Sequence, residues 1–291
     1  MNEPELKTFN GSKARIAYYR WGTSTGQPVF LIHATGFHAR CWDRVVERLP
    51  PGLGAIAPDT RGHGLSERTG PMTDWSLAAG DVCELIEHLD LQDAIGVGHS
   101  KGGHTLVQAA AAAPQRFARL LLVDPVMHPP ELYDQIRSGT NAKDHPVSRR
   151  RNSWITWEEM FEHFRGRYPF SLWRPEVLAD YCRFGVVAKA DGTGFELACP
   201  PEIEASIYLG SASFDIYELA KTVDLPVTIL RARSRTPGDS TMDFASSPTW
   251  ASAAHAFPQG RDVYLPHLTH FIPMQDPELV ARFIVDEQAT T

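Results

Sequence analysis

The chain has 291 residues, of which 43% are hydrophobic and 22% are charged, and these ordinary globular values exclude a disordered chain and a disulfide scaffold. It carries 28 Lys and Arg against 35 Asp and Glu, a net charge of −7, so it lacks the basic excess that neutralises nucleic-acid phosphates. We therefore expect no nucleic-acid partner and, at this length, one large domain or one domain with an insertion.

The N-terminal residues are polar and include Glu3 and Glu5, so they lack the positive charge and apolar run of a secretory leader. We expect a cytoplasmic protein. No stretch approaches the roughly 20 apolar residues that cross a bilayer, so we expect no membrane span. Four cysteines are spread along the chain: Cys41, Cys83, Cys182 and Cys199. They form no C-x-x-C pair, which favours reduced thiols over a zinc or redox site.

Short apolar segments alternate with longer amphipathic ones in the first 125 residues, a pattern typical of strands and helices in a parallel sheet. The predicted strands are 29–33, 55–58, 94–98 and 120–123. The predicted helices are 42–49, 75–89 and 102–113. Residues 13–21 alternate loosely and predict antiparallel edge strands.

The alternation breaks at 129–214, where aromatic residues crowd together beside a run of three arginines. We interpret this region as a helical cap inserted into a core of residues 1–128 and 215–291. After it the pattern resumes, with predicted strands at 227–231 and 262–265 and predicted helices at 248–256 and 277–285. The predicted fold class is therefore α/β: a mostly parallel central sheet with helices on both faces and an inserted helical cap.

The strongest functional signal is Gly98-His99-Ser100-Lys101-Gly102, which lies directly after a predicted strand and directly before a predicted helix. In a G-x-S-x-G turn, small flanking residues permit a strained backbone that raises the serine hydroxyl above the sheet. The N-terminus of the following helix supplies N–H groups where negative charge develops. The motif therefore predicts that Ser100 is a nucleophile.

Three further motifs occur along the chain: His33-Ala34-Thr35-Gly36-Phe37, Asp59-Thr60-Arg61-Gly62-His63-Gly64-Leu65-Ser66, and Leu268-Thr269-His270-Phe271-Ile272-Pro273. With them, nearly the whole chain resembles the α/β-hydrolase superfamily, in its serine-nucleophile branch with a helical cap. The first motif has Ala34 where H-G is the commoner form. Ser100 argues against the dehalogenase and epoxide-hydrolase branches, for which the resemblance implies Asp at that position.

The resemblance implies a triad in the order nucleophile, acid, histidine. It makes His270 the base, with His267 as the only close rival, which we interpret as a loop residue. It also implies an oxyanion hole formed by the backbone N–H groups of Lys101 and Thr35. We interpret the Lys101 side chain as solvated, with contact to an anionic or carbonyl-bearing substrate as the alternative.

The triad acid is open between three residues. In most of the family it follows the strand that resumes after the cap, but here arginines stand near that position, and Asp239 and Asp243 come later. Asp124 closes the predicted strand 120–123, which is the position of the acid in some haloalkane dehalogenases and lactonases. We favour Asp124 and keep Asp239 and Asp243 as alternatives.

The cap aromatics are expected to pack the cap itself, with a subset lining an apolar cleft that selects the substrate. The candidates for the substrate pocket are Phe37, Trp154, Trp157 and Phe161. We interpret Arg149, Arg150 and Arg151 as a solvated or ion-paired face of the cap, with capture of a substrate carboxylate as the alternative.

These residues predict a serine hydrolase that cleaves an ester or lactone of a small, largely apolar substrate, with no cofactor and no metal. One alternative is a non-catalytic ligand-binding receptor on the same fold. Another is a cofactor-independent lyase or oxygenase, because fold and triad do not determine the reaction. The expected partner is a small-molecule substrate, and a homodimer stays open.

Overall fold

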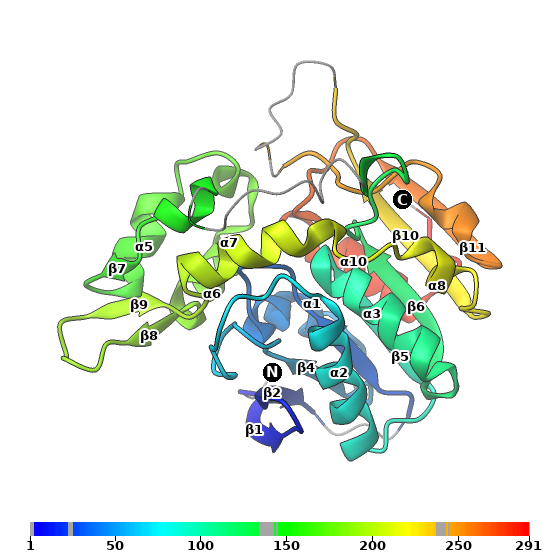
Figure 1. Ribbon diagram of the computed structural model, residues 1–291, viewed down its shortest axis with the longest axis horizontal. Coiled ribbons are helices and arrows are strands. Elements are labelled where there is room, and N and C mark those ends of the chain that lie inside the picture. Colours follow the sequence, from blue (N-terminus) through cyan, green and yellow to red (C-terminus); the bar gives the residue numbers. More distant parts are fainter. Residues whose placement is uncertain are drawn as a thin grey trace.

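The chain folds around an eight-stranded sheet whose strand order is β1-β2-β4-β3-β5-β6-β10-β11 (Figure 1). The computed structural model describes residues 3–22, 26–133, 143, 145–236, 243 and 245–290. The strands are β1 Glu5–Asn10, β2 Arg15–Trp21, β3 Val29–Ile32, β4 Ala55–Pro58, β5 Ala94–His99, β6 Phe117–Val123, β10 Pro226–Ala232 and β11 Gln259–Leu265. Strands β1, β2 and β4 pair antiparallel, and all later pairs are parallel.

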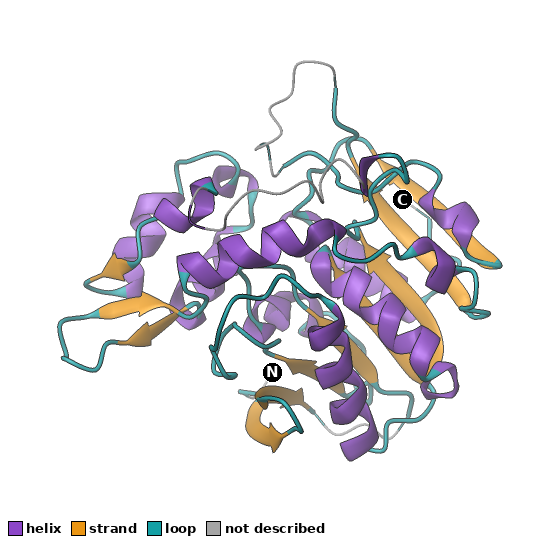
Figure 2. Ribbon diagram, in the orientation of Figure 1, coloured by secondary structure: helices purple, strands orange, loops and turns teal. Residues whose placement is uncertain are grey.

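Helices cover both faces of the sheet (Figure 2). They are α1 Asp43–Val46, α2 Ser76–His88, α3 Lys101–Ala112, α5 Trp157–Phe164, α6 Pro175–Phe184, α7 Pro201–Leu209, α8 Tyr217–Ala220, α9 Ile272–Gln275 and α10 Pro277–Val285. Because alternate strand residues face opposite sides, Phe30 and Ile32 pack in the core cluster of α2, α3 and α8. Val29 and Leu31 pack in the cluster of α1 and α10. The mostly parallel sheet with helices on both faces is confirmed.

The region between β6 and β10 carries elements outside the large sheet. Helices α5 and α6 lie beside a small antiparallel sheet of order β7-β9-β8, with bounds Ser153–Trp154, Phe195–Leu197 and Val186–Ala188. We call residues 153–197 the side lobe, which projects to the left in Figure 1. Helix α7 then runs from the lobe back to the core. The small sheet was not predicted, because its strands are only two or three residues long.

Two local predictions were wrong. The helix expected at 248–256 is only the 3-10 turn Ala253–Ala256, because the N–H of Thr249 donates to the Ser247 hydroxyl and the Thr249 hydroxyl donates to the carbonyl of Pro125, bonds that compete with helical ones. The helix expected at 42–49 is a 3-10 turn, Ala39–Trp42, followed by the single turn of α1. No helix in the described part of the chain is long and apolar enough to cross a membrane.

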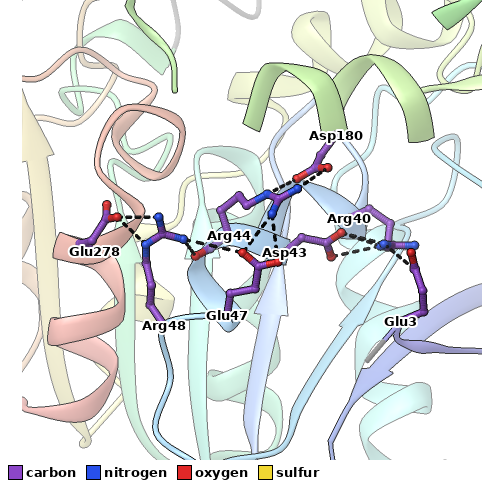
Figure 3. Close-up of polar contacts among 8 residues, drawn as sticks. All are labelled: Glu3, Arg40, Asp43, Arg44, Glu47, Arg48, Asp180 and Glu278. Carbon is purple, nitrogen blue, oxygen red and sulfur yellow. Dashed lines mark hydrogen bonds and ion pairs between the residues drawn. The ribbon is translucent and has the colours of Figure 1, made fainter. Parts of the chain in front are cut away.

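A network of ion pairs joins the side lobe to the core (Figure 3). Arg44 on α1 holds Asp180 on α6 through two bonds, Nε to Oδ2 at 2.7 Å and Nη2 to Oδ1 at 3.0 Å. The Asp180 side chain is only 9% exposed. Arg44 also donates to Glu47, whose side chain is 37% exposed. The bidentate and partly buried Arg44–Asp180 pair is the stronger contact of the two.

Replacing Asp180 by asparagine is expected to lower the free energy of unfolding by about 1–3 kcal/mol, because the Arg44 charge loses its buried partner. In a domain of this size the melting temperature should fall by roughly 2–10 °C. The matched control is Glu47→Gln, which removes an exposed partner of the same arginine and should cost about 0.5 kcal/mol or less. Equal melting temperatures for the two variants would contradict this account of the lobe attachment.

Candidate active site

Ser100 lies on a sharp turn between β5 and α3, with a φ of 56° and a ψ of −121°. The flanking glycines make that turn possible. A Cβ on Gly98 would lie 2.6 Å from the carbonyl oxygen of Gly102, and a Cβ on Gly102 would lie 2.2 Å from the carbonyl oxygen of Ile32. Only glycine lets the helix approach the sheet this closely, so the sequence G-x-S-x-G enforces the strained position of the serine.

The structure brings three of the predicted residues together in a chain of hydrogen bonds. The Nε2 atom of His270 lies 2.9 Å from the hydroxyl oxygen of Ser100. The Nδ1 atom of His270 lies 2.6 Å from Oδ2 of Asp124. These are the distances that a nucleophile, a base and an orienting carboxylate require.

Asp124 is held rigidly from its other side. Its side chain is fully buried, and its Oδ1 atom accepts bonds from the backbone N–H of Ala232 at 2.9 Å and the hydroxyl of Ser247 at 2.6 Å. The hydroxyl of Thr249 lies 3.3 Å from the same oxygen. Sequence reasoning missed Ser247 and Thr249, because their segment reads as the start of a helix. These donors leave Oδ2 to face His270.

The loop that carries His270 is held by its backbone. Its N–H donates to the carbonyl of Ala245 at 2.8 Å, and its carbonyl accepts from Nε2 of His99 at 2.8 Å. Burial lowers the pKa of His99 to about 3, so its ring is neutral at pH 7 and serves as a fixed donor. His267, the rival base, is exposed on the turn that follows β11.

Of the other two candidate acids, Asp243 forms no described hydrogen bond with the His270 ring. Asp243 accepts bonds from Arg233 at 2.9 Å, from the N–H of Ala245 at 3.0 Å and from the hydroxyl of Ser246 at 2.9 Å. Its carboxylate is therefore held by these three donors. Asp239 lies outside the described residues.

The two predicted oxyanion donors lie beside Ser100. Lys101 is the first residue of α3, where helix geometry leaves the backbone N–H without an intrahelical acceptor. Thr35 lines the same cavity as Ser100. The next residue, Gly36, has a φ of 77° and donates its N–H to Nε2 of His63 at 3.0 Å, which fixes the loop that carries Thr35.

The Lys101 side chain is not solvated, so that prediction was wrong. It is 1% exposed, and its amine has no hydrogen-bond partner among the described residues. Burial lowers the pKa of the amine to about 8. The side chain also lies outside the two cavities at the site, so direct contact with a substrate has no support.

Replacing Lys101 by methionine is expected to raise the free energy of unfolding at pH 7 by about 2–4 kcal/mol, because the charged amine is penalised in the folded state. In the unfolded chain the pKa of a lysine amine is about 10.4. Between the folded pKa of about 8 and this value, the folded wild type binds fewer protons than the unfolded chain. The wild-type protein should therefore gain stability over this window, and its difference from the variant should shrink. Thermal melts at pH 7 and pH 10 measure both effects. A variant that melts lower than the wild type at pH 7 would contradict the prediction.

Two cavities meet at the site. The smaller, of about 200 Å³, contains Ser100 and His270 in its wall. The larger, of about 700 Å³, has seven Phe and Tyr side chains among its 17 lining residues. Thr35, Tyr208 and Asp243 line both, so a ligand can extend from Ser100 into the larger space.

Of the four predicted pocket residues, only Phe37 lines the larger cavity. Trp154, Trp157 and Phe161 pack in a hydrophobic cluster that joins the side lobe to core residues such as Phe37 and Phe271, and Trp154 is 1% exposed. None of the three lines either of the two cavities at the site, and Trp157 and Phe161 are half-buried. The aromatic walls come from other residues: Phe164, Tyr168, Phe170, Tyr181, Tyr208 and Phe271.

The cysteines and metal-binding side chains form no further site in the described parts of the chain. Cys41, Cys83, Cys182 and Cys199 are free thiols. The described residues contain no group of three or more His, Cys, Asp or Glu side chains that could hold a metal ion.

Comparisons with known proteins place the chain among hydrolases. A family model described as "Alpha/beta hydrolase family" matches residues 29–283. The chain is 36% identical over 152 residues to a non-heme chloroperoxidase of Streptomyces lividans, a match that covers 52% of this chain and 49% of the relative. It is 25% identical over 276 residues to the bifunctional esterase/perhydrolase DCH of Acinetobacter calcoaceticus, with 91% and 92% covered.

A solved structure has the same fold. E-2-(acetamidomethylene)succinate hydrolase matches with a TM-score of 0.77 at 21% identity, over 97% of this chain and 98% of that one. At this identity the likeness shows the fold alone. Among the curated relatives, the matched part of this chain spans about half the length of the chloroperoxidase.

Proposed function

The chain belongs to the alpha/beta hydrolase family, and we propose that it is a serine hydrolase that cleaves a carboxylic ester or lactone through an acyl-enzyme. The observation that carries the proposal is the hydrogen-bonded chain from Ser100 through His270 to Asp124. A serine hydroxyl is a weak nucleophile by itself, and an adjacent oriented base is what activates it. The larger cavity, with seven Phe and Tyr side chains in its wall, suits a small, mostly apolar substrate.

In the acylation step, Nε2 of His270 takes the proton of Ser100 while Oγ attacks the carbonyl carbon of the substrate. The backbone N–H groups of Lys101 and Thr35 stabilise the negative oxygen of the tetrahedral intermediate. The protonated His270 then gives its proton to the leaving alcohol oxygen, and the acyl group stays on Ser100. Asp124 holds Nδ1–H throughout and stabilises the imidazolium.

In the deacylation step, His270 removes a proton from a water molecule, and the hydroxide attacks the acyl carbonyl. The bond to Oγ breaks, Oγ recovers the proton, and the carboxylic acid leaves. For a lactone, the alcohol and the acid leave as one hydroxy acid. Every step uses only water, the substrate, and side chains and backbone N–H groups of this chain.

Perhydrolysis is a second candidate, favoured by the name of the relative that this chain matches over 91% of its length. Hydrogen peroxide would replace water in the deacylation step, so that the acyl group leaves Ser100 as a peracid. Adding hydrogen peroxide to an ester reaction and measuring peracid tests it. Ester cleavage without peracid would leave hydrolysis as the sole activity.

A serine-directed organophosphonate tests the main proposal. It should add one adduct per chain, and peptide mapping should place the adduct on Ser100 because His270 activates that oxygen. A panel of nitrophenyl esters and lactones should show turnover that the phosphonate abolishes. An unlabelled Ser100 with no turnover would instead favour a ligand-binding receptor or a lyase or oxygenase on this fold.

A further inference from the structure

The larger cavity holds one firmly placed cation in its aromatic wall. Arg150 donates from Nη1 to Oε2 of Glu204 at 2.6 Å and from Nη2 to the hydroxyl of Tyr181 at 3.1 Å. Glu204 comes from α7 and its side chain is 5% exposed, while Tyr181 comes from α6 and is 4% exposed. Two buried partners from two helices therefore fix the guanidinium at the cavity wall.

The two bonds use two of the five N–H donors of the Arg150 guanidinium. No other described contact uses the remaining donors, and the side chain, which is 22% exposed, lines the cavity. A planar guanidinium with neighbouring free N–H groups is the usual protein ligand for a carboxylate. The wall thus offers an anion site among aromatic side chains and already paired charges.

The neighbouring arginines differ from Arg150. Arg149 is exposed at the end of a 3-10 turn. Arg151 reaches the rim of the larger cavity, but its side chain is 44% exposed, pairs with Glu159 and lies 4.0 Å over the ring of Trp154. Only Arg150 combines buried partners with a place in the cavity wall. The sequence alone did not separate the three.

Glu204 links this cation to the oxyanion loop. A Cβ on Gly36 would lie 2.4 Å from Oε1 of Glu204, so the carboxylate lies directly against the backbone of that residue. Gly36 follows Thr35, which lines both cavities. The position of Arg150 is therefore set with respect to the oxyanion loop, and through it with respect to Ser100.

The buried ion pair itself indicates a use beyond stability. Apolar residues of similar volume are often as stabilising as a buried pair, because both charges lose water. The carboxylates of the two cavity walls also have cationic partners already: Glu204 has Arg150, and Asp243 has Arg233. A substrate carboxylate would therefore meet free guanidinium donors and no unpaired negative charge from these two residues.

We propose that Arg150 binds a carboxylate of the substrate, so that the protein acts on anionic esters whose acid group lies in the larger cavity while the ester carbonyl lies at Ser100. The inference rests on the proposed ester hydrolysis and adds its substrate class. Arg150 is a specificity-determining residue in this account, since it contacts a part of the substrate that does not react.

The test compares two pairs of esters of matched size. The first pair, 4-acetoxybenzoate and 4-tolyl acetate, differs by a carboxylate on the alcohol side. The second pair is the 4-nitrophenyl monoester of adipic acid and 4-nitrophenyl hexanoate. These two esters differ by a carboxylate on the acyl side. For at least one pair, Arg150→Met is expected to lower kcat/KM for the acid about 10- to 150-fold more than for the neutral ester. The loss should fall mainly on KM, because the contact is the same in the ground and transition states.

Three variants keep the result interpretable. Arg149→Met removes a neighbouring exposed arginine and should change kcat/KM for all four esters less than about twofold. Glu204→Gln removes the competing carboxylate and should keep or raise the preference for acids. The double variant Arg150→Met with Glu204→Gln leaves no unpaired buried charge, so it shows the lost preference even where the single variant folds poorly.

A binding measurement separates this inference from the proposed function. With Ser100→Ala, calorimetry should detect 4-acetoxybenzoate or adipate monoester binding that weakens about 10- to 150-fold when Arg150→Met is added. That result would support the anion site even if the wild type cleaves no ester. Equal losses for acids and neutral esters, or binding that Arg150→Met leaves unchanged, would overturn the proposal and leave Arg150 a structural residue.

Discussion

Ser100→Ala is expected to lower kcat for ester cleavage by about 10⁴- to 10⁶-fold, because it removes the only oxygen that lies 2.9 Å from Nε2 of His270 among the described contacts. The oxyanion hole and the cavity remain, so a small rate above the uncatalysed reaction should persist. The protein should still bind substrate with a KM or dissociation constant close to that of the wild type. Initial rates with a nitrophenyl ester measure the loss.

The control for this variant is Ser171→Ala, which removes an exposed serine hydroxyl in the side lobe and should keep the wild-type rate. The phosphonate should label the control and leave Ser100→Ala unlabelled. A Ser100→Ala protein that keeps more than a tenth of the wild-type kcat, with a normal melting temperature, would refute the acyl-enzyme mechanism.

The central strands could be predicted closely from the sequence because every residue of β3 and β4 is buried. Such strands read as short apolar runs, and no partner information is needed to find them. The edge strand β1 was missed for the opposite reason. Its six residues are half-buried or exposed, so ELKTFN shows no apolar run, and its pairing with β2 is visible only in the folded sheet.

The site shows the same contrast between residues with a local sequence signal and residues that meet only in the fold. The turn around Ser100 is encoded within five residues, because the glycines that permit it are its sequence neighbours. The identity of the triad acid depends on contacts between distant parts of the sequence, since Asp124 and His270 are 146 positions apart. The signal for Asp124 was its place at the end of a buried strand, and the pairing of β6 with β10 then decides what surrounds it.

Side-chain direction was the least predictable property. Lys101 was expected to be solvated, yet its side chain is 1% exposed and its amine is buried. Trp157 and Phe161 stand four residues apart on α5 and pack in the cluster that joins the side lobe to the core, and neither lines the two cavities at the site. Arg150 and Glu204 form a hydrogen bond although they are 54 positions apart in the sequence. None of these contacts has a local sequence signal.

Asp124→Asn is expected to lower kcat by about 10⁴-fold, close to the loss seen when serine proteases lose the same carboxylate. The reason is the tautomer of His270. The Oδ1 atom of Asp124 faces the N–H of Ala232 and the hydroxyl of Ser247, so the asparagine oxygen will occupy that side. Its NH₂ group then faces Nδ1 of His270, which must become an acceptor. The proton moves to Nε2, and the histidine no longer accepts a proton from Ser100.

The matched control is Asp243→Asn, which removes a carboxylate that lines both cavities and bonds Arg233, Ala245 and Ser246. It should lower kcat less than about tenfold, because its carboxylate is held by these three donors. The two variants are compared only if their circular dichroism spectra match that of the wild type, which shows that both are folded. Asp124→Asn is also expected to lower the melting temperature, since a lost buried hydrogen bond costs about 1–3 kcal/mol. A folded Asp124→Asn protein with near wild-type kcat, beside an inactive Asp243→Asn or Asp239→Asn protein, would move the acid to the segment after β10. Ser100 and His270 would keep their proposed roles, because their 2.9 Å contact does not depend on which carboxylate orients the ring.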